Sequence, residues 1–502
     1  MLRLLLPFFV LSLFLLLLTC AEEDPGIRKG RLLADQYCGS CHLVPEPDQL
    51  NRSLWISEVL PKMGAYFGHY APYDRAFYLG PDQEKANIQH LYPLETTMDT
   101  ADWRAIREYF INAAPDRLEE DAAEAPPLWE LEQFAVREIS APLHQKLAPL
   151  TTLISFHEES GEILVGGPKR SGGSLDRFTN GSQWIDRREL GSAPSAVGAQ
   201  HEMVLEMGSL LPSDFARGSL TQLRDSSTLL DNLARPVDVL RIDLDLDGQE
   251  ELIVAEYGNL IGRLSRFEES TPGKFLPLTP LAATPGAIRL RRADLNADGH
   301  DDLVVLFAQG DERIDVWYSH AAGPKHEQLL RFPPSYGSSD LEIVDVDDDG
   351  KLDLVYANGD NFDYQPVPKI YHGIRVFLHR QGQYREEFFY PMDGVYGLEV
   401  ADFDGDGDQD IAAVAYYVPP AERSLRSFVY LEQLNFPEFR GQSFRKPRDQ
   451  YYMCMTRGDI DGDGDQDLLL GNFAGYLPDG MPGENARTPG QPAYLLLENR
   501  HR

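Results

Sequence analysis

Cysteine is scarce in this sequence, with only four in 502 residues. They are Cys20, Cys38, Cys41 and Cys454. Once Cys38 and Cys41 are taken together as a pair, no second close pair remains, so a disulfide-stapled scaffold is excluded. A structural zinc site is excluded too, because it needs a further CxxC or a histidine pair at ligand spacing. We expect Cys454, between two methionines, to be a buried small hydrophobic residue.

Basic residues are few as well, with 46 Lys and Arg against 80 Asp and Glu and a formal charge of −34. This charge repels nucleic acid and anionic membrane surfaces, so neither is expected as a partner. Many carboxylates gather in short loops, which indicates bound cations. The sequence also lacks a dinucleotide fingerprint and a nucleophile–base constellation. Scattered histidines in the C-terminal part show no ligand spacing: His201, His300, His320, His326 and His372.

No hydrophobic run is long enough to span a bilayer. The longest, Leu4 to Leu18, has 15 residues against the ~20 that a spanning helix needs, and with Arg3 before it the run is typical of a signal peptide. Leu17-Leu18-Thr19-Cys20 resembles the lipobox of bacterial lipoproteins, although Thr19 replaces the usual Gly, Ala or Ser. We therefore expect a signal peptide at residues 1–19 and a lipid anchor on Cys20. The alternative is an ordinary signal peptide with an incidental cysteine.

The strongest motif is Cys38-Gly39-Ser40-Cys41-His42. Two thiols three positions apart on one helical turn reach the two vinyl groups of a haem, and the adjacent histidine falls beneath the iron. A thioredoxin-like CxxC would follow a strand, and none is expected here. The sequence therefore predicts covalent haem c on Cys38 and Cys41, with His42 as an iron ligand.

Helical patterns flank this motif. Residues 30–37 form a short amphipathic segment, and Thr100 is expected to cap a helix over 101–113. Its apolar residues follow helical spacing: Trp103, Ile106, Tyr109 and Phe110. The layout resembles the class I cytochrome c fold over roughly residues 26–118, and the resemblance implies that the first and last helices pack against each other at the haem edge.

The sixth iron ligand stays open between several residues. Met63 follows a Trp-containing helix in a pattern that resembles a group of monohaem cytochromes, and it is preferred. Met98 lies at a separation closer to ordinary class I cytochromes, but leaves little chain before Thr100 for a ligand loop. His69 and His90 are the remaining candidates. A methionine ligand would raise the reduction potential and a second histidine would lower it.

Beyond a Glu-, Ala- and Pro-rich linker the sequence is periodic. Five acidic loops recur, first at 51-residue and then at 57-residue steps. Their acidic and amide residues at positions one, three, five and nine are Asp243, Asp245, Asp247 and Glu251; Asp294, Asn296, Asp298 and Asp302; Asp345, Asp347, Asp349 and Asp353; Asp402, Asp404, Asp406 and Asp410; and Asp459, Asp461, Asp463 and Asp467.

These loops are suited to calcium. Alternate oxygen ligands converge on one point, the glycine at position six permits the backbone reversal, and an oxygen-only set selects a hard cation. An EF-hand is excluded, because the twelfth position is apolar or aromatic and the flanks look like strands. The alternative is a set of Asx-stabilised hairpins without metal.

A period near 50 residues with several short strands per unit indicates propeller blades. The region resembles FG-GAP/VCBS repeat propellers, the architecture of the integrin α head. Degenerate blades without the acidic set are expected near 151–166 and 196–208, which gives seven blades of about 52 residues each. The final strand, residues 493–498, is expected to complete the first blade.

The sequence thus predicts a multidomain chain, with a small all-α cytochrome c domain followed by an all-β, seven-bladed propeller. Its parts are the signal peptide 1–19, the cytochrome domain 20–118, a linker 119–139 and the propeller 140–502. We expect an exported lipoprotein of the outer membrane or cell surface, with a periplasm-facing position also open. It would carry single electrons to or from a redox partner protein. Alternatives are a propeller enzyme that passes electrons to the haem, and an integrin-like adhesion protein.

Overall fold

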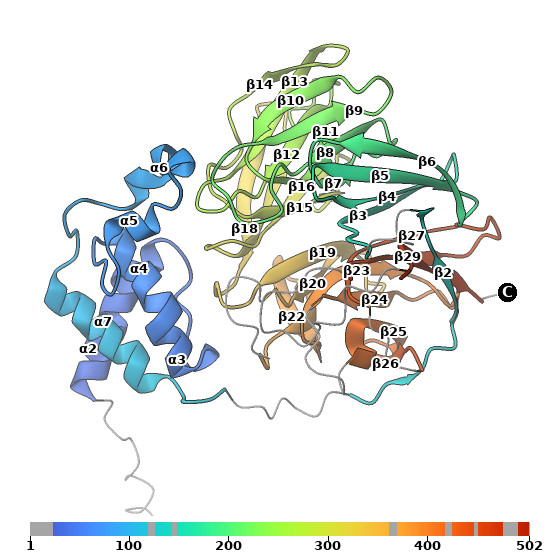
Figure 1. The fold of residues 1–502 in the computed structure, drawn as a ribbon. Coiled ribbons are helices and arrows are strands. Elements are labelled where there is room, and N and C mark those ends of the chain that lie inside the picture. The colour runs from blue at the N-terminus through green and yellow to red at the C-terminus, as the bar shows by residue number, and fades with distance from the viewer. Residues whose placement is uncertain are drawn as a thin grey trace, which may run out of the picture.

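The computed structural model describes residues 24–118, 126–142, 148–360, 369–416, 424–445, 450–474 and 490–500. The predicted signal peptide and lipidation site Cys20 lie outside these residues. Within them, a helical N-terminal part stands beside a seven-bladed β-propeller (Figure 1). No helix in the described ranges has the length and apolar character needed to cross a bilayer.

The helical part spans residues 24–118 and consists of short elements. These are α2 (Pro25–Tyr37), η2 (Cys38–Ser40), η3 (Pro47–Gln49), α3 (Arg52–Leu54), η4 (Trp55–Val59), α4 (Leu60–Tyr66), α5 (Arg75–Tyr78), α6 (Asp82–Ile88), η5 (Gln89–Leu91) and α7 (Thr100–Ala113). The segment η4 is a single π-turn inside the helical run from α3 to α4. Such a turn widens the helix locally and often lies at a functional site.

Helices α2 and α7 cross at Gly30. A Cβ atom at this position would lie 2.3 Å from the carbonyl oxygen of Ala105, so the close crossing requires glycine. The predicted apolar face of α7 is buried as expected. Its N-cap is Asp99 and not the predicted Thr100, because the Asp99 carboxylate accepts a hydrogen bond from the Ala101 amide at 2.7 Å.

Seven sheets form the blades of the propeller. Blade one is β3 (Leu153–His157), β4 (Glu162–Pro168), β5 (Gly173–Thr179) and β6 (Gln183–Leu190), and blade two is β7 (Pro194–Val197), β8 (Met203–Glu206), β9 (Gly218–Gln222) and β10 (Thr228–Leu233). Blade three is β11 (Pro236–Ile242), β12 (Glu251–Glu256), β13 (Arg263–Thr271) and β14 (Lys274–Pro277), and blade four is β15 (Ala287–Ala293), β16 (Asp302–Phe307), β17 (Arg313–Tyr318) and β18 (Lys325–Arg331). The first two are the predicted degenerate blades.

Of the remaining three blades, the last two also contain a strand from the start of the propeller. Blade five is β19 (Ser338–Val344), β20 (Asp353–Asn358), β21 (Gly373–Arg380) and β22 (Gln383–Pro391); blade six is β23 (Val395–Ala401), β24 (Asp410–Ala415), β25 (Phe428–Asn435) and β26 (Glu438–Ser443), with β1 (Trp129–Glu130) at its edge; blade seven is β27 (Tyr452–Gly458), β28 (Asp467–Asn472) and β29 (Tyr494–Asn499), with β2 (Phe134–Ile139). The short helix η7 (Ser424–Ser427) precedes β25.

The ring is closed by β2, which pairs antiparallel with β29. A strand from the start of the propeller therefore completes the last blade. The prediction that the final strand, residues 493–498, completes the first blade is wrong. Strands β1 and β2 also fall inside the segment predicted as linker, so the propeller begins at Trp129 and not at residue 140. Closure pairs two strand edges that would otherwise remain open.

Neighbouring blades are joined by side chains of their innermost strands. The hydroxyls of Thr152, Ser195 and Ser339 donate to the carbonyl oxygens of Pro194, Pro236 and Val395 on the next blade. The second strands of blades three to seven are buried along their whole length, which explains the apolar runs after each acidic loop.

The helical part rests on propeller loops that connect second to third strands. Leu260 and Ile261 pack against the apolar cluster of Ala65, Leu79, Ile88 and Tyr92. Around them, Asn87 donates to the backbone oxygen of Asp214 at 2.9 Å. Buried Asp214 in turn accepts the amides of Leu260 and Ile261, which fixes this loop beneath the helices. The acidic loops, which connect first to second strands, lie at the opposite ends of these strands.

Candidate functional site

The Cys38–His42 segment forms a tight turn at the end of α2. The amides of Cys41 and His42 both donate to the Cys38 carbonyl oxygen, at 3.1 and 3.4 Å, so the segment winds as one helical turn. Cys38 is buried and Cys41 is exposed. Burial raises the pKa of the Cys38 thiol to about 11, so the thiol stays protonated at neutral pH. Such a thiol is unlike the low-pKa cysteine of a CxxC disulfide oxidoreductase.

The His42 imidazole is oriented by its own neighbour. Its Nδ1 lies 2.9 Å from the carbonyl oxygen of Leu43. A carbonyl oxygen can only accept, so Nδ1 carries the proton and Nε2 keeps its lone pair. A backbone acceptor on one ring nitrogen is the usual device that fixes the tautomer of a metal-ligating histidine.

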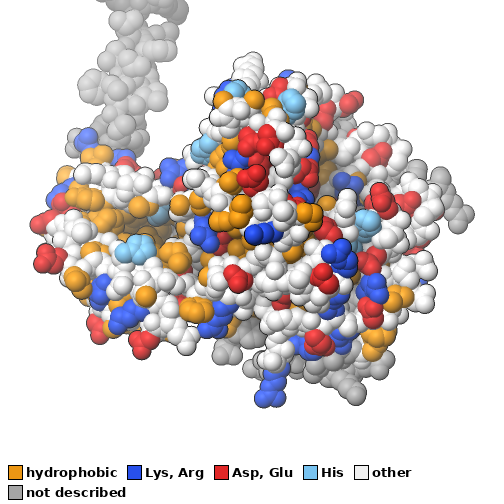
Figure 2. Space-filling model, turned by 90° about the horizontal axis from the view of Figure 1, so that it is seen from above, with side chains coloured by type: hydrophobic (Ala, Val, Ile, Leu, Met, Phe, Trp, Pro, Cys, Tyr) orange, Lys and Arg blue, Asp and Glu red, His pale blue; other side chains and the backbone are white. Residues whose placement is uncertain are grey.

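A cavity of about 370 Å³ opens next to this segment. Of the predicted haem-binding residues, Cys38, His42 and Met63 line it, whereas Cys41 and Met98 do not. The other lining residues of the helical part are mostly apolar or aromatic: Pro45, Leu50, Trp55, Val59, Leu60, Lys62, Tyr66, Phe77, Tyr78, Tyr92, Trp103, Ile106 and Phe110. In Figure 2 hydrophobic side chains gather around a hollow on the helical part, at the left of the view.

The alternative sixth ligands are placed less favourably. Met98 is 3 % exposed and packs in the core between the helices. His69 stacks on Trp103, and its Nε2 donates to the Met98 carbonyl oxygen at 3.1 Å. Neither His69 nor His90 lines the cavity. Of the residues that the sequence offered, only Met63 shares a cavity with His42.

The propeller supplies part of the cavity wall, which the sequence did not predict. Its contribution comes from loops of blades three to five: Asn259, Leu260, Ala308, Gln309, Gly310, Glu312, Pro334, Ser335, Gly337, Asp360 and Lys369. Glu312 is 2 % exposed and accepts hydrogen bonds from the Ser338 amide and hydroxyl. Burial raises the pKa of this carboxyl to about 7. No motif marks these residues, because only the fold brings their loops together.

The acidic loops have one recurrent geometry. In the first loop both oxygens of Asp243 accept backbone amides, from Asp247 and Gly248, while Glu251 accepts the amide of Leu244 at 2.9 Å. Four loops bring three carboxylates within 4.8 Å of one another. These are Asp243, Asp245 and Glu251; Asp345, Asp347 and Asp353; Asp402, Asp404 and Asp410; and Asp459, Asp461 and Asp463.

The second loop, from Asp294 to Asp302, forms no such group of three carboxylates among the described residues. Its third position is Asn296, whose side-chain amide donates to Asp298 at 2.9 Å. The loop keeps the same backbone turn, since the Gly299 amide donates to Asp294 at 2.8 Å. This loop therefore offers one carboxylate fewer at position three, where Asn296 can supply only an amide oxygen.

Several carboxylate oxygens in the loops are buried without a hydrogen-bond partner in the part of the chain that the structure describes. They belong to Asp245, Asp347, Asp402, Asp408 and Asp465. Asp408 and Asp465 occupy the seventh position of the last two loops and were not among the predicted ligands. Gln249, His300 and Lys351 stand there in the first three loops, so a pattern shared by all five loops could not include this position.

Arginines enter two of the loops. Arg266 donates to Asp245 at 2.6 Å and also to Glu251 in the first loop. Arg380 donates to Asp349 at 2.6 Å and also to Asp347 in the third loop. These guanidinium groups neutralise carboxylates that were predicted to bind calcium, and the fourth and fifth loops have no comparable pair among the described residues.

Comparisons with known proteins support the repeat. Residues 294–356 and 345–413 match the model of the FG-GAP-like repeat, so the chain contains FG-GAP repeats within its seven-bladed propeller. No curated protein sequence matches the chain significantly.

Similar solved structures share little sequence with the chain. The WD40 domain of SCAP from fission yeast is 11% identical, with 68% of this chain and 88% of that chain covered and a TM-score of 0.36. BBS1N in complex with ARL6DN is 10% identical, with coverage of 74% and 97% and a TM-score of 0.43. Sqt1 of Saccharomyces cerevisiae is 8% identical, with coverage of 74% and 99% and a TM-score of 0.43.

Proposed function

We propose that the helical part is a monohaem cytochrome c domain and that the protein carries single electrons outside the cytoplasm. Haem c would be attached to Cys38 and Cys41, with His42 and Met63 as the axial ligands. When bound, the haem supplies a one-electron centre. The observation that carries the proposal is the single cavity lined by Cys38, by His42 with its free Nε2, and by Met63.

The surrounding residues fit a haem. The cavity walls are mainly apolar, and Trp55, which is 1 % exposed, is held by a hydrogen bond from its Nε1 to the Pro47 carbonyl oxygen at 2.8 Å. The propeller loops cover a further side of the cavity. Exclusion of water lowers the local dielectric, which disfavours the more highly charged oxidised centre and raises its potential.

The propeller would act as a docking module for the redox partner, and its acidic loops would bind calcium. The buried carboxylate oxygens without partners support calcium, because an ion would satisfy them. Burial raises the pKa of Asp410 and Asp467 to about 7, so their ionisation costs free energy that a cation would offset.

Export and anchoring complete the proposal. Haem c is attached outside the cytoplasm, which agrees with the signal sequence and the lipid anchor expected at Cys20. The protein would then lie at the outer membrane or the cell surface as a lipoprotein. Replacement of Cys20 by Ser should release the protein from the membrane fraction without loss of haem, as fractionation and staining for covalent haem would show.

The test is expression in cells that are competent in cytochrome maturation. The wild-type chain should be coloured and retain haem after denaturation, while a Cys38→Ala, Cys41→Ala chain should be colourless. A Cys454→Ala chain is the matched control and should keep full haem content, because Cys454 lies in the propeller. A colourless wild-type protein would overturn the proposal.

A second candidate is an enzyme whose propeller oxidises a substrate and passes electrons to the haem. One observation favours it: the central channel of the propeller shares wall residues with the haem cavity. Purified oxidised protein that is reduced by a small molecule alone would favour the enzyme, and rapid reduction only by a second protein would favour the carrier.

A further inference from the structure

The central channel of the propeller widens to a cavity of about 390 Å³. This volume lies in the range of small-molecule sites. Part of the lining is apolar and aromatic, with Met207, Leu210, Leu211, Pro212, Met453 and Phe473. Polar and charged side chains of the innermost strands contribute as well, so the cavity offers both an apolar half and a polar half of its lining.

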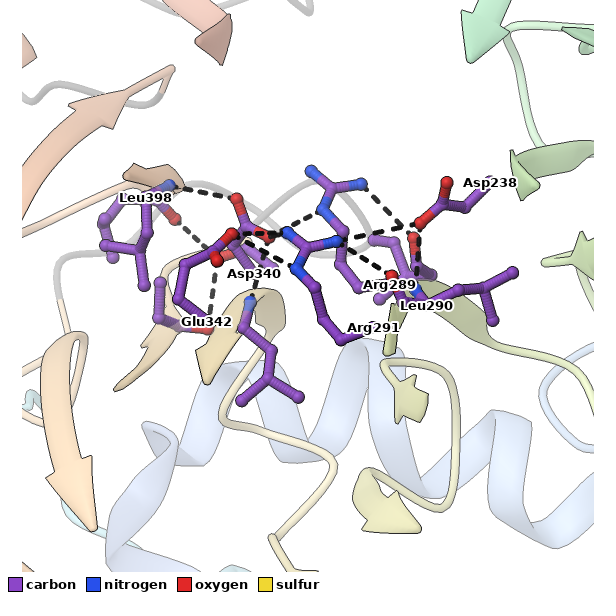
Figure 3. Close-up of polar contacts among 12 residues, drawn as sticks. Asp238, Arg289, Leu290, Arg291, Asp340, Glu342 and Leu398 are labelled. Atoms are coloured by element: carbon purple, nitrogen blue, oxygen red, sulfur yellow. Dashed lines mark hydrogen bonds and ion pairs between the residues drawn. The ribbon is translucent and has the colours of Figure 1, made fainter. Parts of the chain in front are cut away.

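The polar half contains a charged cluster on β11, β15 and β19, shown in Figure 3. Asp340 accepts hydrogen bonds from Arg289 Nε at 2.7 Å and from Arg291 Nη2 at 3.3 Å. Asp340 also accepts the Leu398 amide of the next blade at 3.0 Å, and Asp238 accepts the Leu290 amide at 2.9 Å. The two aspartates therefore join blades, and their acceptor capacity is used within the protein.

Some donors in the channel remain without a partner among the described residues. Arg289 uses Nε on Asp340 and Nη1 on the Ile288 carbonyl oxygen, which leaves Nη2. The Tyr396 hydroxyl and the Nε2 amide of Gln309 likewise have no partner among the described residues. Gln309 uses only its side-chain oxygen, which accepts a hydrogen bond from Tyr257. All three side chains line the channel, and none of these three atoms is among the fully buried atoms without a partner.

Gln309, Asn259 and Asp360 line both the channel and the haem-attachment cavity. A molecule in the channel would thus be separated from the haem cavity by a single layer of side chains. A channel without a function would be filled by side chains or would open away from the helical part, and this channel does neither.

We propose that this channel is a binding site for a small organic carboxylate with an apolar body. The unpartnered groups are donors, which suit the oxygens of a carboxylate, and the cationic Arg289 strengthens such hydrogen bonds. The apolar half would take the hydrocarbon part. A neutral polyol fits less well, because its hydroxyl donors would need acceptors. Asp238 and Asp340 already accept hydrogen bonds from the protein, and Glu399, which also lines the channel, is paired with Arg457 at 3.3 Å.

The site itself does not depend on haem, but its effect on the haem rests on the proposed function. We would titrate benzoate and phenylacetate, with benzamide and phenylacetamide as neutral counterparts, into the full-length holoprotein and into the haem-free Cys38→Ala, Cys41→Ala chain. Calorimetry and thermal shift should show that the acids bind both proteins and that the amides bind at least tenfold more weakly. Binding to the holoprotein should also shift the haem absorption spectrum.

Two variants test the residues. Arg289→Gln should weaken benzoate at least tenfold, and Tyr396→Phe about fivefold, since each removes one donor. Tyr396→Phe keeps the ring and the packing, so it remains informative if Arg289→Gln fails to fold. Tyr73→Phe, on the exposed surface of the helical part, is the matched control and should bind as the wild type does.

Several outcomes would overturn the proposal. These are equal binding of acids and amides, binding of neutral sugars in preference to either, or unchanged affinity in Tyr396→Phe. If neither benzoate nor phenylacetate binds the haem-free chain while the holoprotein is coloured, the channel site is overturned and the cytochrome proposal stands. If these acids bind a wild-type protein that is colourless, the cytochrome proposal is overturned and the channel site stands.

Discussion

At the scale of single residues, the sixth ligand of the proposed haem depends on which methionine reaches the cavity. Met63 lines the cavity on α4, whereas Met98 is buried in the core. Met63→Ala should therefore abolish the weak long-wavelength absorption of a methionine-ligated ferric haem and lower the reduction potential. Met98→Leu conserves volume and should leave the spectrum unchanged, at a stability cost below about 1.5 kcal/mol. The reverse pattern would assign the ligand to Met98.

Glu312 gives the cavity a pH dependence. Burial raises the pKa of this carboxyl from 4.5 to about 7. Between pH 4.5 and about 7, Glu312 is therefore protonated in the folded protein and ionised in the unfolded chain. The resulting stability is present at low pH and is lost as the pH rises through about 7. Glu312→Gln stays neutral, so its melting temperature should fall less than that of the wild type between pH 5 and 8.

The same carboxyl group of Glu312 should influence the proposed haem. An ionised carboxylate in the cavity wall stabilises the oxidised iron, so the midpoint potential of the holoprotein should fall as the pH rises through about 7. Potentiometric titration should show a flatter profile for Glu312→Gln. A matched Glu387→Gln chain, altered on the exposed side of blade five, should behave as the wild type does. Identical profiles for all three proteins would contradict a role for Glu312.

The sequence identified residues whose chemistry requires a fixed local spacing and missed those that act through the fold. Cys38, Cys41 and His42 are recognisable because one helical turn must present them together. Glu312, Arg289 and Tyr396 have no such signature, since each comes from a different strand or loop. Asp408 and Asp465 were missed although they are acidic, because the prediction used only positions that all five loops share.

At the scale of elements, the acidic loops are alike in sequence but differ in electrostatics. Arg266 and Arg380 already neutralise carboxylates in loops one and three, whereas Asp408 and Asp465 add a fifth carboxylate to loops four and five. We expect calcium to bind more tightly to the last two loops, because more carboxylates there lack a counter-charge.

Substitutions in single loops can test this order. Asp463→Asn in loop five should lower the calcium-dependent gain in melting temperature clearly, and Asp247→Asn in loop one should lower it little. Differential scanning calorimetry with calcium and with excess chelator measures the gain, and elemental analysis counts bound calcium. Equal effects of the two substitutions, or a melting curve that ignores the chelator, would contradict the expected order.

The strands were predictable where burial repeats. Second strands of the blades are buried throughout and follow an acidic loop, so their apolar runs recur with a regular period. Strands β1 and β2 have no such signal, because they are short or alternate in burial and pair only with strands from the C-terminal blades. A local pattern cannot reveal a partner that lies hundreds of residues away.

At the scale of the whole molecule, the propeller and the helical part line one cavity, so both parts would define the environment of the proposed haem. The seven-bladed count followed from period and length, but the placement of the helical part on the loops of blades two to five did not. Those contacts depend on Leu260, Ile261 and the buried carboxylate Asp214, none of which stands out in the sequence.

Disruption of this contact should therefore alter the proposed haem without changing the residues proposed as its ligands. Leu260→Ser removes an apolar side chain that both packs against the helical part and lines the cavity. It should admit water, lower the midpoint potential and increase exchange of backbone amides in residues 61–92, as potentiometry and hydrogen exchange would show. Leu276→Ser, on the exposed side of β14, is the control and should change neither. If Leu260→Ser keeps the wild-type potential, the propeller does not shield the haem, and its role would be restricted to partner or ligand binding.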